Sequence, residues 1–202
     1  MSFRTASLAA LVVCVAAVAL AQAPPAPTRI RGTISAVDAA SVSIATREGP
    51  TATFPLSEKL TVGAVKAIDI SEIKTGTFIG TAAEPAPDGT LTALEVLLFP
   101  EAMRGTGEGH YPWDLKPGSN MTNATVSAVV EGKAGRDLEL AYKGGTAKVR
   151  VPPNVPIVTV VPAERADLKP GLAVFAIALP GADGKLTVVR MNIGKYGVAP
   201  PM

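Results

Sequence analysis

The sequence contains few of the residues that build catalytic and metal centres. It has one cysteine and one histidine, so it can form no disulfide within the chain and no zinc site rich in these residue types. Basic and acidic residues number 19 and 17, without a run of Lys or Arg, so little charge is available for binding a phosphate backbone. We therefore expect no nucleic-acid partner.

Long helices are also not expected, because breakers of helices are spread along the whole chain. There are 19 glycines and 18 prolines, whereas aromatic residues make up only 4% of the sequence. Glycine and proline at this density favour short strands that are joined by turns. The composition therefore predicts an all-β protein.

The longest apolar run lies at the N-terminus, where it has the form of a secretory signal. Arg4 precedes an uninterrupted apolar stretch, Leu8 to Leu20, and small residues flank Leu20 in Ala19-Leu20-Ala21. We expect residues 1–21 to be removed before Gln22, together with Cys14. The mature protein is then periplasmic, and it has no further apolar stretch long enough to span a bilayer.

A proline- and alanine-rich leader, residues 22–28, precedes two segments that resemble each other. The similar pairs are Gly32–Val37 with Ala124–Val129, Thr51–Leu56 with Thr146–Val151, Ile73–Gly76 with Leu168–Gly171, and Asp88–Thr92 with Asp183–Thr187. The last three pairs keep one spacing of 95 positions, which indicates an internal duplication. We predict a first module over residues 29–99, a Gly/Pro-rich linker over 100–122, and a second module over 123–202.

Within each module, apolar residues recur at every second position, which is typical of strands. We expect short helical turns at Asp69–Lys74 and Ala163–Leu168, with Gly76 and Gly171 ending them. The strands that we expect are Ile30–Ala36, Ser41–Thr46, Thr51–Leu56, Thr77–Ala83, Thr90–Phe99, Asn123–Val130, Leu138–Tyr142, Thr146–Val151, Leu172–Leu179 and Lys185–Ile193. Three strands, a short helix and two strands is the order of an oligonucleotide/oligosaccharide-binding (OB) barrel. The prediction is two tandem small OB-like β-barrels.

Several of these segments resemble a bacterial domain-of-unknown-function family of exported, OB-like β-barrel modules. The resemblance rests on Gly32–Val37, Ile73–Ile79, Asp88–Val96 and the linker, which is similar to that of two-module proteobacterial members. It implies the fold and the exported compartment. It implies no activity and no catalytic residues.

The linker contains most of the unusual side chains. The only His, the only Trp, Tyr111 and two of the five Met lie there. Loops with such side chains often carry function. The candidate ligand-binding residues are Arg104, Glu108, His110, Tyr111, Trp113 and Asp114. Alternatively, the aromatic residues only seal a seam between the two barrels. Both interpretations require Trp113 to be largely buried.

Two other chemistries stay open for the linker. Met103, His110 and Met121 have the thioether and imidazole groups that suit copper(I). His110 and Asp114 could belong to a small hydrolase, although no serine lies on a strand-to-helix elbow. We expect an exported protein without enzymatic activity or cofactor, which binds an unknown small molecule or an envelope protein; a copper-binding protein is the alternative.

Overall fold

The computed structural model describes residues 26–132, 135–181 and 183–201, so the predicted signal, residues 1–21, lies outside it. The described residues form strands and three short 3₁₀ turns, which confirms the all-β prediction. The strands are β1 (Thr28–Val37), β2 (Ser41–Thr46), β3 (Thr51–Ala67), β4 (Phe78–Pro85), β5 (Leu91–Leu98), β6 (Gly109–Pro112), β7 (Asn120–Gly132), β8 (Gly135–Tyr142), β9 (Gly145–Val151), β10 (Ile157–Ala163), β11 (Ala173–Pro180) and β12 (Leu186–Ile193). No helix in the described part is long and apolar enough to cross a membrane.

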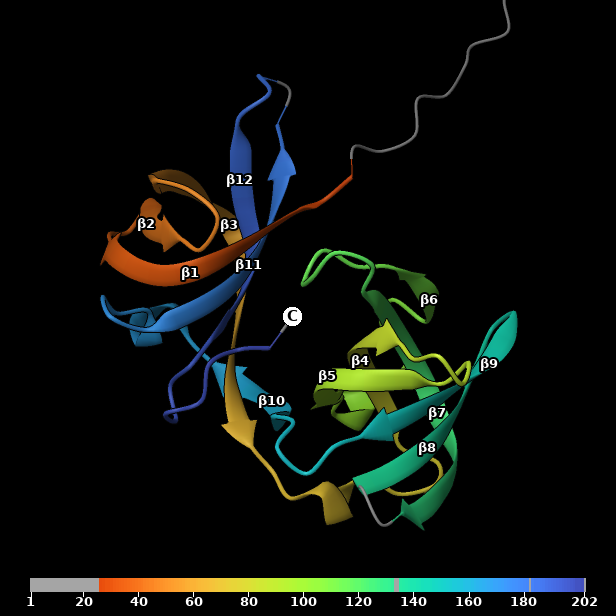
Figure 1. Cartoon of the computed structure of the whole chain (residues 1–202). Coiled ribbons are helices and arrows are strands. Elements are labelled where there is room, and N and C mark those ends of the chain that lie inside the picture. The colour runs from red at the N-terminus through yellow and green to blue at the C-terminus, as the bar shows by residue number, and fades with distance from the viewer. Residues whose placement is uncertain (1–25, 133–134, 182, 202) are drawn as a thin grey trace, which may run out of the picture.

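The strands pair into two closed rings. In the first ring, β12, β11, β1, β2 and β3 follow one another, and β12 pairs with β3 to close it. In the second ring, the order is β5, β4, β7, β8 and β9, and β5 pairs with β9. Figure 1 shows the two rings as separate lobes, one in orange and blue and the other in yellow-green and teal. The colours already show that each ring contains distant parts of the chain.

Each ring combines three strands from one half of the chain with two strands from the other half. Strands β1 to β3 close with β11 and β12, whereas β7 to β9 close with β4 and β5. The prediction that residues 29–99 and 123–202 each form a barrel of their own is therefore wrong. The reason is the length of β3, which we expected to end at Leu56 but which continues to Ala67 and carries the chain into the other lobe.

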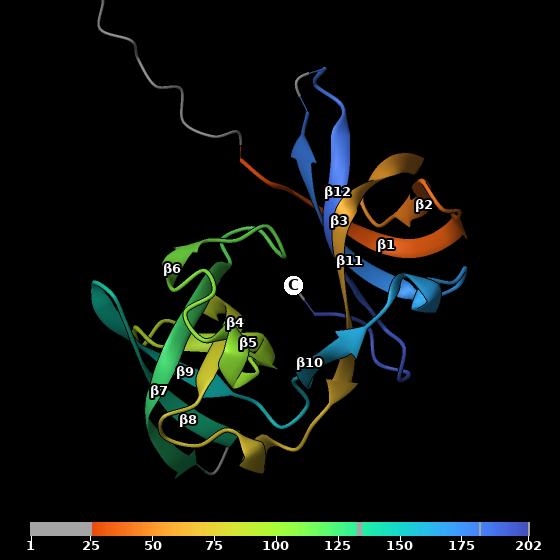
Figure 2. The ribbon, with the colours of Figure 1, turned by 180° about the vertical axis from the view of Figure 1, so that it is seen from behind.

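The chain returns along β10, a strand that we did not predict. Val62–Ala67 of β3 pairs antiparallel with Val158–Ala163 of β10, and Val65 lies opposite Val160. These two valines are 95 positions apart, the same spacing as between Gly76 and Gly171. The two crossing strands thus meet at positions that correspond to each other, and Figure 2 shows them between the lobes.

The short helical turns are present but smaller than expected. The first, η1 (Ile70–Glu72), is capped by Asp69, whose carboxylate accepts a hydrogen bond of 2.8 Å from the Ser71 backbone amide. The second is η3 (Arg165–Asp167). Both end before the glycines, so the expectation that Gly76 and Gly171 end them is wrong. The two glycines have φ near +89° and +88°, and their amides bond the neighbouring β7 and β1.

Three groups of buried apolar side chains hold the molecule together. One fills the first ring and a second fills the second ring. The third consists of Val65, Phe78, Leu97, Phe99 and Val158 and lies with the crossing strands and the adjoining β4 and β5. Burial of this third group links the two rings through packing, in addition to the continuous backbone of β3.

The predicted linker, residues 100–122, is largely structured. It begins with a 3₁₀ turn, η2 (Glu101–Met103), and continues into β6, which we did not predict. Strand β6 pairs antiparallel with the start of β7, so that His110 lies opposite Thr122 and Tyr111 lies opposite Met121. The linker is therefore an extra strand on the second ring, followed by a loop.

Candidate functional site

A cavity of about 160 Å³ lies at the seam between the two rings, and we call it the seam cavity. Residues of both rings, of β10 and of the linker line it: Leu97, Phe99, Met103, Thr106, Gly107, Tyr111, Trp113, Asn123, Val160, Phe175, Ile177, Arg190 and Asn192. Most of them are apolar, with a few polar groups. Such a lining is typical of a small-molecule site.

Asn123 on β7 holds the linker over this cavity. Its side-chain amide donates to the carbonyl oxygens of Thr106 and Gly107, at 3.1 and 3.2 Å, and lies 3.3 Å from the Tyr111 hydroxyl. Gly107 has φ of +57°, and a Cβ there would come within 2.9 Å of the Asn123 amide nitrogen. Only glycine fits this turn without strain, which explains one glycine of the linker.

Tyr111 and Trp113 form one wall of the seam cavity, with ring centroids 6.0 Å apart. Burial raises the pKa of Tyr111, and the nearby positive charge of Arg29 opposes this shift. Trp113 is half-buried rather than fully buried. Its indole Nε1 is inaccessible to solvent and has no hydrogen-bond partner in the described residues.

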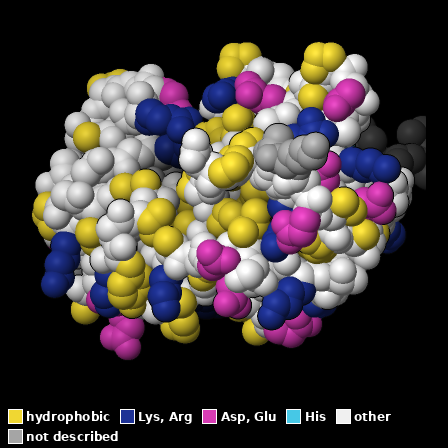
Figure 3. All heavy atoms as spheres, turned by 60° about the horizontal axis from the view of Figure 1, so that its bottom comes forward, with side chains coloured by type: hydrophobic (Ala, Val, Ile, Leu, Met, Phe, Trp, Pro, Cys, Tyr) yellow, Lys and Arg dark blue, Asp and Glu magenta, His cyan; other side chains and the backbone are white. Residues whose placement is uncertain are grey.

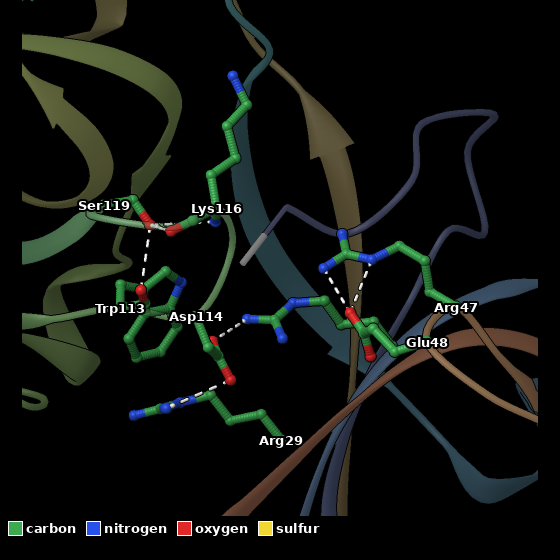
Figure 4. Close-up of polar contacts among 8 residues, drawn as sticks. Arg29, Arg47, Glu48, Trp113, Asp114, Lys116 and Ser119 are labelled. Carbon is green, nitrogen blue, oxygen red and sulfur yellow. Dashed lines mark hydrogen bonds and ion pairs between the residues drawn. The ribbon is translucent and has the colours of Figure 1, made fainter.

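The loop around Trp113 is fixed on both sides. On one side, the Trp113 amide donates to the Ser119 carbonyl oxygen at 2.8 Å, and the buried Ser119 hydroxyl lies 3.1 Å from the Trp113 carbonyl oxygen. On the other side, the Arg29 guanidinium stacks over the indole ring, 3.8 Å from its centroid. Figure 4 shows Ser119 and Arg29 on opposite sides of Trp113.

Asp114 ties the linker to the first ring. Its carboxylate accepts a hydrogen bond of 2.7 Å from Arg31 and lies 3.6 Å from Arg29, and both arginines belong to β1. Burial alone would raise the pKa of Asp114, but the hydrogen bond from Arg31 and the charges of both arginines outweigh it. The pKa of Asp114 is therefore lowered, and its carboxylate is committed to this contact.

Arg104 and Glu108 fasten the linker to the second ring. Arg104 bonds the Glu101 carboxylate and donates to the Gly76 carbonyl oxygen at 2.8 Å. Glu108 accepts a hydrogen bond of 3.0 Å from the Lys143 amide, in the turn between β8 and β9. Neither side chain lines the seam cavity. Arg104 and Glu108, which the sequence analysis includes among the ligand-binding candidates, are thus not brought together with Tyr111 and Trp113 at the seam cavity.

His110 faces away from the seam cavity. Its Nδ1 lies 2.8 Å from the Thr122 hydroxyl, and its ring stacks on Tyr142 at a centroid distance of 6.1 Å. Neighbouring residues of a strand point to opposite faces, so His110 and Tyr111 lie on different sides of β6. Asp114, bonded to arginines, is not brought together with His110. The His110 and Asp114 pair expected for a hydrolase therefore does not form.

The structure also separates the three residues of the copper hypothesis. Met121 lies directly opposite Tyr111, so it faces the side away from His110. Met103 lines the seam cavity, again on the Tyr111 side. His110 therefore lies on the opposite face of β6 from the side on which Met121 lies.

The sequence analysis missed Arg29, Arg31, Ser119 and Arg190, all of which contribute to the seam. Arg31 lies in the predicted strand Ile30–Ala36 and Arg29 directly precedes that strand, so their spacing of two is the one sign in the sequence that they share a face. Arg190 lies on β12, whose place in the first ring follows from the strand exchange. No local pattern indicates that exchange.

Figure 3 shows hydrophobic side chains gathered at the middle of one face of the molecule, where the two lobes meet, with charged side chains around them.

Comparisons of the chain with protein-family models, with curated proteins and with solved structures found no match.

Proposed function

We propose that this is an exported, non-enzymatic binding protein that holds a small ligand in the seam cavity. One observation carries the proposal: the only tryptophan lines a mostly apolar cavity between two rings and keeps a buried, unpartnered N–H. A buried donor without an acceptor is costly, at about 1–3 kcal/mol, so an acceptor is expected there when the site is filled.

The fold supports this proposal through the way in which it positions the cavity. The linker, the crossing strand β10 and both rings contribute residues to the wall of the cavity. The site therefore exists only when the strands are exchanged between the two halves of the chain. We further propose that each ring is an OB-like barrel. Three strands, a short turn and two strands follow one another in the first half, and the second half has the same order if β9 and β10 together correspond to the long β3. Export to the periplasm rests on the signal at residues 1–21.

The test uses Trp113 as its own reporter, because the chain has no other tryptophan. Native mass spectrometry of protein purified from the periplasm should show a retained small molecule, or a screen of small organic molecules should give a saturable change in Trp fluorescence. Ile177→Phe, which places a larger side chain on the cavity wall, should abolish binding. Leu179→Phe, on the same strand but exposed and outside the cavity lining, is the matched control.

The proposal fails if neither a retained molecule nor a saturable change is found. It also fails if binding survives in Ile177→Phe, because the ligand would then occupy another place.

A further inference from the structure

Arg190 on β12 is the one charged residue that lines the seam cavity. Its side chain is exposed, so it lies at the mouth of the cavity. Each of the other seven arginines in the described residues forms an ion pair or a hydrogen bond. The guanidinium of Arg190 has neither within the described residues, so it is available to a ligand.

The corresponding position in the other half of the chain has the opposite charge. Arg190 is 95 positions from Glu95, and Asn192 is 95 positions from Leu97. These are alternate residues of β12 and β5, which occupy corresponding places in the two rings. The positive charge at the cavity mouth is therefore present in only one of the two halves, so the internal duplication does not explain it.

The one charged group that the cavity lining offers is a donor. Arg190 can only donate, and so can Trp113 Nε1, which is buried behind the cavity wall. Asn123 Oδ1 is also unpartnered, but it lies against Gly80, where an added Cβ would come within 2.5 Å of it. Asp114, the linker carboxylate that follows Trp113, is held by Arg31. A ligand with a negatively charged acceptor would pair with Arg190, whereas a cation would be repelled by it.

The size of the cavity limits the rest of the ligand. A volume of about 160 Å³ is close to that of an engineered apolar cavity, about 150 Å³, which accepts benzene. Phe99 and Phe175 offer aromatic surface around it. One six-membered ring or a short branched chain fits, and its charged end would lie at the mouth.

We propose, on the basis of the proposed function, that the ligand is a small organic monocarboxylate whose apolar body fills the seam cavity and whose carboxylate contacts Arg190. Guanidinium and carboxylate form paired, charge-assisted hydrogen bonds, which select an anion over a neutral molecule of the same shape.

The experiment compares benzoate with benzamide, which has the same ring but no charge, by isothermal titration calorimetry on the mature protein. Benzoate should bind at least about tenfold more tightly than benzamide, which corresponds to about 1.4 kcal/mol. Arg190→Gln should weaken benzoate by about that factor and leave benzamide unchanged. Lys59→Gln removes an exposed charge that does not line the cavity and should change neither.

The outcomes separate this inference from the proposed function. If benzamide binds as well as benzoate and Ile177→Phe abolishes both, the cavity is a ligand site but the anion selectivity is refuted. The inference is also refuted if Arg190→Gln leaves benzoate binding unchanged. If neither probe binds and the purified protein retains no molecule, the proposed function fails with it.

Discussion

The two rings share their strand pairing but differ in the side chains through which they meet. Bulges interrupt β1 between Ile34 and Ala36 and β7 between Val126 and Ala128, and the closing pairs are parallel in both rings. At the seam, by contrast, Phe175 lies opposite Arg31 in the first ring, whereas Gly80 lies opposite Asn123 in the second. Both rings thus close through the same alternation of buried and exposed residues along their strands. The side chains at the seam, by contrast, differ between the two halves of the chain.

The largest effect is expected where the two rings share structure. Val65 is 1% exposed and lies opposite Val160 in the crossing strands. Val65→Asp would bury an unpaired carboxylate there, and we expect a loss of about 4 kcal/mol of unfolding free energy. Urea unfolding followed by circular dichroism measures it, and both rings should unfold in one transition because β3 of the first ring pairs with β10, which pairs with β5 of the second ring.

Val130→Asp is the control, because Val130 is 55% exposed on β7. It should change the stability by less than about 0.5 kcal/mol. Two separate transitions in Val65→Asp, with one ring intact, would contradict the view that the crossing strands unite the rings.

The next largest effect is expected at the linker. Trp113→Ala removes the indole that packs on Tyr111 and beneath Arg29. Because the ring is half-buried, we expect a loss of about 2–3 kcal/mol, somewhat below the cost for a fully buried Trp. Trp113→Phe should recover more than half of this loss. Equal stabilities of Trp113→Ala and the wild type in thermal unfolding would show that the linker is not docked.

The smallest effect depends on pH. The pKa of Asp114 is lowered in the folded protein, so its carboxylate stabilises the fold above its ordinary pKa of about 3.9. This contribution is lost as the pH falls through the lowered pKa. Asp114 is half-exposed, so Asp114→Asn should cost only about 1 kcal/mol or less at neutral pH.

Denaturant midpoints at neutral pH and below about pH 3 test this prediction. The difference between Asp114→Asn and the wild type should shrink in acid. A difference that stays constant over this range would mean that the ion pair with Arg31 does not contribute through its charge.

Most of the strands, though not β6 and β10, could be predicted from the sequence, because burial on one face imposes a period of two. Val42 and Ile44, for example, are fully buried and alternate with more exposed serines. Asp69 as a cap could also be predicted, because a side-chain oxygen before a short turn bonds its free amides. These features depend on neighbours within a few residues.

The strand exchange could not be predicted in this way. Residues 60–67 alternate like other strands, but nothing local in the sequence states whether the chain returns to the same ring or enters the other one. The unusual residues of the linker could be selected from the sequence. Which of them face the seam cavity could not, because the register of β6 with β7 places Tyr111 and Trp113 on one side and His110 on the other. Arg190 reaches the seam only through the exchange.

The strand exchange is tested most directly by paired cysteines, since the mature chain predicted here has none of its own. Thr33 lies opposite Ala173 in the first ring, whereas Thr125 lies opposite Phe78 in the second. In two tandem barrels, Ala173 would instead lie opposite Thr125. The matched variants are Thr33→Cys with Ala173→Cys, and Thr125→Cys with Ala173→Cys, each oxidised and digested for mass spectrometry. The exchanged fold predicts a disulfide in the first variant and none in the second, because bridged residues must lie within about 7 Å; a disulfide in the second alone would contradict it.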